Sequence, residues 1–73
     1  MKNVSCEMYD VYERLAMHKT PLRMYLKAAA GERVIEGVLV NFRVLEGVEH
    51  GYLENGEHFP LIDILRYEEL KAE

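Results

Sequence analysis

Residues 22–44, LRMYLKAAAGERVIEGVLVNFRV, decide the fold of this chain. In the first seven residues Leu22, Met24, Leu26 and Ala28 alternate with charged or aromatic side chains, which predicts a strand with one buried face. A turn follows at Ala29–Glu32, where glycine can take a positive φ. We expect residues 33–44 to form one long second strand, because a glycine inside a strand, here Gly37, often marks a bend or bulge. Such a bend is what a small barrel needs to curl its sheet.

An apolar stripe with helical spacing precedes this sheet. Its members are Met8, Val11, Tyr12, Leu15 and Ala16. The spacing predicts an amphipathic helix over about residues 6–17. Ser5 is a suitable N-cap. Pro21 is expected to end the helix, because it biases the preceding residue away from helical dihedral angles.

Downstream, three further short strands are expected at Val48–Leu53, Glu57–Leu61 and Ile62–Tyr67. The turn before the first of these is Leu45-Glu46-Gly47. Asn55-Gly56 is the strongest hairpin signal in the chain and predicts a type I′ turn. Pro60 cannot donate to a strand ladder, so its strand ends there or lies at an edge. Residues 68–73 are expected to form a polar tail.

One helix followed by five short strands predicts a mostly β fold that forms a single domain over residues 1–73. We expect the strands, over about residues 22–67, to form a small, strongly bent antiparallel barrel. Gly31, Val34, Gly37, Leu39 and Phe42 are spaced as G-x-x-V-x-x-G-x-L-x-x-F. This spacing resembles the first half of an Sm-type barrel. The resemblance implies an Sm-like domain in which the N-terminal helix lies across one open end.

Composition excludes several classes of protein. With 73 residues the chain has room for one small domain with a thin core. No apolar run exceeds three residues, as in Val38–Val40, so neither a membrane span nor a signal-peptide core is expected, and the cytoplasm is the expected location. Nine basic against thirteen acidic residues give a net charge of −4, which opposes binding to a polyanion.

Catalysis and cofactor binding are poor fits to this sequence. His18, His50 and His58 share no short spacing, whereas a metal site needs three or four converging ligands. Cys6 is the only cysteine, which excludes an internal disulfide and a cysteine-based zinc site. No glycine-rich loop matches a phosphate-binding motif. We therefore expect no enzyme activity, no metal and no cofactor.

The most informative surface is one side of the predicted helix. It carries Glu7, Asp10 and Glu13 together with Tyr9, and these four residues are called the acidic helical face below. Acidic residues near a helix N-terminus complement the helix dipole and keep a small domain soluble. Alternatively, the face docks on a basic surface of another protein, with charge complementarity steering association and the aromatic ring as an anchor.

The helix sequence, Cys6-Glu7-Met8-Tyr9-Asp10-Val11-Tyr12-Glu13, resembles the opening of the Rof family, bacterial Rho-binding antiterminators, as C-x-x-Y-D-x-x-E. The family's strand-rich part is similar to Leu22–Lys27 with Gly31-Glu32. Its closing hairpin and last strand are similar to Tyr52–Glu57 and Leu61–Ile64. The chain departs from the family pattern at Ala28-Ala29-Ala30 and at Leu45-Glu46-Gly47.

The resemblance implies a protein that binds the transcription terminator Rho at its RNA-loading domain and reduces Rho-dependent termination. Tyr9, Asp10 and Glu13 correspond to family residues that face Rho, and Glu7 belongs to the same face. The expected partner is thus a protein; direct binding to nucleic acid or membrane is not expected, and the chain is expected to be monomeric.

Two other readings of the sequence stay open. The first is an Sm-like RNA-binding subunit that assembles into a ring, although Arg43 and Val44 stand where those proteins carry an acidic base-reading residue after the strand-two aromatic. The second is a small regulatory interaction domain with a different partner, on which the acidic face serves solubility alone.

Overall fold

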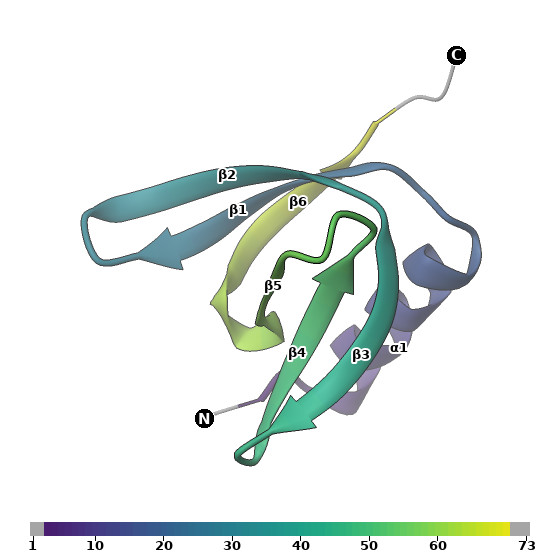
Figure 1. Cartoon of the computed structure of the whole chain (residues 1–73), viewed down its shortest axis with the longest axis horizontal. Helices are drawn as coiled ribbons and strands as arrows, with labels where there is room; N and C mark the ends of the chain where they lie inside the picture. Colours follow the sequence, from purple (N-terminus) through teal and green to yellow (C-terminus); the bar gives the residue numbers. More distant parts are fainter. Residues whose placement is uncertain (1–2, 71–73) are drawn as a thin grey trace.

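The structure is mostly β, with one N-terminal helix followed by strands, and Figure 1 shows it as a computed structural model that describes residues 3–70. The elements are α1 Cys6–Met17, β1 Leu22–Ala28, β2 Gly31–Gly37, β3 Leu39–Leu45, β4 Val48–Leu53, β5 His58–Pro60, the 3-10 helix η1 Leu61–Asp63, and β6 Ile64–Glu69. The predicted bounds of the helix and of the strands at 22–28 and 48–53 are confirmed.

Helix α1 begins and ends with defined caps. The Ser5 hydroxyl accepts a hydrogen bond from the Met8 amide at 3.2 Å, which confirms the predicted N-cap. At the other end Lys19 adopts φ 52°, and the amides of Lys19 and Thr20 donate to the carbonyls of Ala16 and Leu15. These paired bonds form a Schellman motif, so backbone geometry ends α1 before Pro21.

Within the described residues, six antiparallel strands form two three-stranded sheets, in the orders β2-β1-β6 and β3-β4-β5. The prediction of five strands was wrong, because the expected long strand at 33–44 divides at Val38. Its first part pairs with β1 and its second part with β4. The pairs observed within residues 3–70 do not close into a barrel.

The division follows immediately after Gly37, the predicted bend. A Cβ at Gly37 would lie 3.1 Å from Leu53 Cδ1, so the missing side chain lets β2 leave the first sheet close to the end of β4. Val38 then connects the sheets, and its carbonyl accepts a hydrogen bond from the Glu54 amide. The last predicted strand, Ile62–Tyr67, begins instead with η1 and continues as β6 to Glu69. Positions 71–73 of the predicted tail lie outside the described residues.

The type I′ turn does not form where the sequence favoured it. Glu46 and Gly47 both have positive φ, 52° and 78°, as a type I′ turn between β3 and β4 requires. At Asn55-Gly56 only Gly56 has a positive φ, 90°, and the loop from β4 to β5 is longer. The Asn55 carboxamide oxygen accepts from the Glu57 amide at 2.9 Å and stabilises this longer loop.

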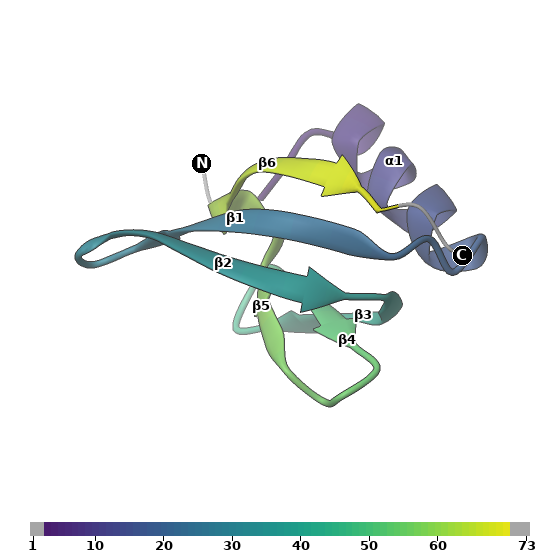
Figure 2. The same ribbon diagram turned by 90° about the horizontal axis from the view of Figure 1, so that it is seen from above.

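The hydrophobic core lies between the two sheets and under α1 (Figures 1 and 2). Its buried members are Tyr12, Leu15, Leu22, Met24, Leu26, Ile35, Leu39, Leu53, Phe59 and Leu61. Helix α1 spans both sheets: the Tyr9 ring lies 5.5 Å from Phe42 of β3, and the Tyr12 ring lies 6.1 Å from Tyr67 of β6. This double packing fixes which side of α1 faces solvent. None of the helices within residues 3–70 has the length and apolar character needed to cross a membrane.

Candidate functional site

The three carboxylates of the acidic helical face point to solvent. Glu7, Asp10 and Glu13 are all exposed, because Tyr12 and Leu15 on the opposite side of α1 are buried against the sheets. Three negative charges therefore lie along about two turns of one helix surface.

These carboxylates have no ion-pair partner among residues 3–70. The ion pairs of the described chain lie elsewhere, on the outer surface of the sheet β2-β1-β6, between Arg23 and Glu36, Arg23 and Glu68, and Arg66 and Glu32. Arg14 follows Asp10 by one turn, but it lines the recess between α1 and β6 and comes within ion-pair distance of no described carboxylate. The charge of the acidic helical face is thus left for solvent or a partner.

Tyr9 differs from the other members of the face, because it is half-buried. Its ring packs against Phe42 with an interplanar angle of 46°. Burial raises the pKa of the Tyr9 hydroxyl, and the nearby charges of Glu13 and Glu49 raise this pKa further. The ring is therefore held in place by the sheet, with its hydroxyl in negatively charged surroundings, and can act as a rigid contact.

Glu49 of β4 extends the acidic helical face onto the sheet, which the sequence did not indicate. Its backbone amide donates a hydrogen bond to the Asn3 side chain at 2.8 Å, and Asn3 also donates to the Gly47 carbonyl at 3.1 Å. One carboxylate oxygen of Glu49 is shielded from solvent and has no hydrogen-bond partner among the described residues. Packing of α1 on the sheet β3-β4-β5, not helical spacing, brings Tyr9 near Glu49, so no local sequence signal could have revealed it.

On the outer surface of the sheet β2-β1-β6, unlike on the acidic helical face, acidic side chains form ion pairs with arginines. Arg23 Nε lies 2.7 Å from Glu36, and its Nη1 lies 3.3 Å from Glu68. These hydrogen bonds raise the pKa of Arg23 above its ordinary range. Hydrogen bonds from Tyr25 and Arg23 lower the pKa of Glu68. Arg66 lies 4.0 Å above the Tyr25 ring and pairs with Glu32, so both Arg23 and Arg66 have partners on this surface.

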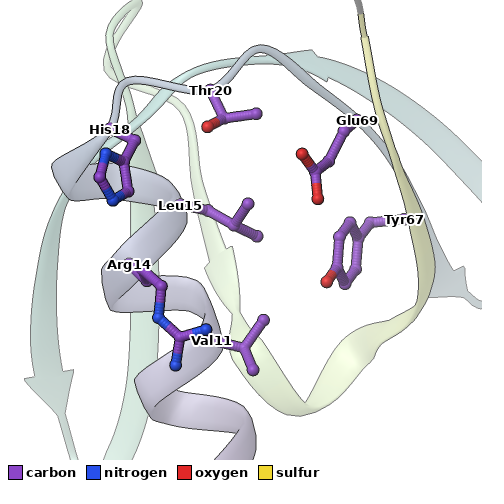
Figure 3. Close-up of a pocket in the computed structure, with 7 residues that line it drawn as sticks. All are labelled: Val11, Arg14, Leu15, His18, Thr20, Tyr67 and Glu69. Atoms are coloured by element: carbon purple, nitrogen blue, oxygen red, sulfur yellow. The ribbon is translucent and has the colours of Figure 1, made fainter.

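A recess lies between α1 and β6 and is shown in Figure 3. Its volume is about 580 Å³, and its lining residues are Val11, Arg14, Leu15, His18, Thr20, Tyr67 and Glu69. Apolar side chains form the floor, while Arg14 and Glu69 stand on opposite walls (Figure 3). This volume is within the range of small-molecule pockets, although the recess is wide open. None of the four residues of the acidic helical face lines it.

The three histidines share no short spacing in the sequence, yet two of them meet in the fold. His50 of β4 and His58 of β5 meet across the strand pair, with their Nδ1 atoms 3.2 Å apart. His18 lies apart from them, at the C-terminal end of α1. No group of three or more His, Cys, Asp or Glu side chains suited to a metal ion is found among residues 3–70.

Comparisons of the chain with protein-family models, with curated proteins and with solved structures found no match.

Proposed function

We propose that this domain binds the transcription terminator Rho at its RNA-loading domain through the acidic helical face, and so inhibits Rho-dependent termination by blocking access of RNA. The observation that carries the proposal is that Glu7, Asp10 and Glu13 are exposed and form no ion pair within the described chain. By contrast, three acidic residues on the outer surface of the sheet β2-β1-β6 are paired with arginines. An RNA-loading surface presents Lys and Arg to phosphates, and unpaired carboxylates are rival anions for the same side chains.

The helix motif supports the choice of partner. Tyr9, Asp10 and Glu13 occupy the positions of the C-x-x-Y-D-x-x-E pattern that resembles the Rof family. Tyr9 adds an aromatic ring that is already immobilised against Phe42, so little side-chain entropy is lost when a partner packs on it. A rigid aromatic group beside exposed acids is a suitable centre for an interface with a basic protein surface.

We further propose that the fold is Sm-like. Across the two sheets the strand order is β6-β1-β2 followed by β3-β4-β5, and the single residue Val38 joins the two halves. This arrangement, with a helix ahead of the strands, supports an open, strongly bent relative of the Sm barrel. The proposal assigns the domain no catalytic activity and no direct contact with RNA. It would act as a monomer in the bacterial cytoplasm, where transcription takes place.

The proposal is tested by charge reversal on the acidic helical face. Asp10→Lys and Glu13→Lys should each abolish binding to purified Rho, measured by calorimetry or interferometry, because each replaces an attraction with a repulsion. Binding of the wild type should weaken as salt is raised, since exposed charges are screened beyond about 10 Å at 0.1 M ionic strength. Circular dichroism should show an unchanged fold, because both side chains are exposed.

Glu54→Lys is the matched control. Glu54 is exposed in the loop between β4 and β5, which lies on the side of the molecule away from α1 in Figure 2. This variant changes the net charge by the same amount and should bind Rho like the wild type. If all three variants bind equally well, the acidic helical face is not the interface.

A further inference from the structure

We propose that His50 and His58 form a two-histidine binding site for a divalent transition-metal ion, of the kind that imidazole ligands favour: Cu²⁺, Ni²⁺ or Zn²⁺. The site lies on the outer surface of the sheet β3-β4-β5 and is independent of the acidic helical face.

Strand register brings the two rings together. In the pairing of β4 with β5, Gly51 stands opposite Phe59 and Tyr52 stands opposite His58. Gly51 and Phe59 are buried, so the neighbouring positions His50, Tyr52 and His58 project from the other surface of the sheet. His50 and His58 are diagonal neighbours there, with ring centroids 5.3 Å apart.

The distance between the two nitrogens suits chelation. The Nδ1 atoms face each other at 3.2 Å. A zinc–imidazole bond is about 2.0–2.1 Å long, so one ion bound to both nitrogens would subtend an angle of about 100–106° between them, close to the tetrahedral value. In the metal-free protein, one Nδ1 must carry a proton and donate it to the other. When a metal ion binds, that proton would move through solvent to Nε2 of the same ring, and both neutral imidazoles would then bind the ion through Nδ1.

Neighbouring side chains hold the rings in this geometry. The His58 ring stacks on Tyr52, with centroids 4.7 Å apart and an interplanar angle of 19°. The guanidinium of Arg43 lies 5.7 Å from the centre of the same Tyr52 ring. The two histidines supply two ligands, and no further His, Cys, Asp or Glu joins them within the described chain. Water would complete the coordination, so the site is open and weaker than a four-ligand structural site.

Calorimetric titration of the tag-free protein with ZnCl₂, NiCl₂ and CuCl₂ tests the proposal. The exposed thiol of Cys6 is a competing ligand, so the titration is repeated in the Cys6→Ser background. We expect one ion per chain, with Cu²⁺ bound most tightly, and a rise in the midpoint of thermal unfolding because the ion links β5 to β4. One ion per two chains, with each copy supplying its pair, would also support the site.

His58→Gln and His50→Gln should each weaken binding at least tenfold and remove the thermal shift. His18→Gln is the matched control: it removes the third histidine, which lies outside the pair, and should leave both readouts unchanged. His58 is exposed, so its replacement should not disturb the fold. No saturable binding by the Cys6→Ser protein would overturn the proposal, as would affinities that are equal in the His58→Gln and His18→Gln variants.

Discussion

Replacing Gly51 of β4 with alanine should destabilise the domain by about 1–3 kcal/mol, because the added methyl group overpacks the core. Its Cβ would lie 2.9 Å from Leu39 Cδ2 and 2.9 Å from Leu61 Cδ2, whereas carbon atoms pack best at about 3.5–4.0 Å. Leu39 is 1% exposed and Leu61 is 0% exposed, so neither can turn out to solvent.

Urea unfolding followed by circular dichroism measures this cost. Alanine also lowers the conformational entropy of the unfolded chain, which stabilises the folded state by about 0.4–1 kcal/mol. The net loss of stability should stay within about 1–3 kcal/mol. For a domain of this size it corresponds to a fall in the thermal unfolding midpoint of about 4–24 °C. Leu61→Val should reduce the cost of Gly51→Ala, because it removes one of the two crowded methyl groups, and a double-mutant cycle gives the coupling.

Gly37→Ala is the comparison. Its Cβ would lie 3.1 Å from Leu53 Cδ1 and make none of the 2.9 Å contacts found at Gly51, so Leu53 has to move by only a few tenths of an ångström and we expect a smaller loss, about 1 kcal/mol or less. The packing argument is refuted if Gly51→Ala is as stable as the wild type, or if Gly37→Ala is the more damaging of the two.

Three further predictions concern the caps, the turn and the charges. Ser5→Ala removes the cap of α1 and should cost about 1 kcal/mol in urea unfolding; an unchanged midpoint would mean that the cap is dispensable. Asn3→Ala removes both side-chain hydrogen bonds to the β3–β4 turn and should cost about 1–2 kcal/mol, with faster amide exchange confined to that turn; exchange that rises uniformly would contradict the local role. Hydrogen bonds from Tyr25 and Arg23 lower the pKa of Glu68, so its stabilisation is present above its unfolded-state pKa and is lost as the pH falls through the folded-state pKa. Glu68→Gln should therefore lower stability at neutral pH and have little effect once the pH is below the folded-state pKa of Glu68, and an equal effect in both conditions would contradict the assignment.

The sequence predicted the elements whose cause is local. The stripe along α1 and the cap at Ser5 depend on near neighbours, and the alternation in Leu22–Ala28 shows one buried surface. The division at Val38 could not be predicted in this way, because both halves of residues 31–45 favour an extended chain. Which sheet each half joins depends on pairing with distant strands.

The turns show the same limit. Asn55-Gly56 has the residues that a type I′ turn prefers, yet the Asn55 side chain bonds Glu57 and supports a longer loop. Glu46-Gly47 takes the tight turn instead, because the register of β3 and β4 places Leu45 opposite Val48 and leaves only two residues between them.

In the candidate site, too, the sequence predicted the residues with a local cause and not those that depend on tertiary contacts. The exposure of Asp10 and Glu13 follows from helical geometry alone. Glu49 and the histidine pair emerge only from the structure, because packing of α1 on the sheet brings Tyr9 near Glu49 and strand register places His50 next to His58. Spacing along the chain did not indicate the histidine pair, because eight residues separate His50 from His58 and the register of their strands depends on the conformation of the loop that joins them.

Competition at the RNA-loading domain of Rho tests the central claim most directly. A fluorescent oligonucleotide bound to purified Rho is titrated with the wild-type protein, and its anisotropy reports displacement. The account predicts that the protein releases the oligonucleotide, that excess unlabelled oligonucleotide in turn releases the protein, and that Asp10→Lys does neither. Simultaneous binding of protein and oligonucleotide to the same Rho would contradict the claim, as would displacement that is equally strong with Asp10→Lys.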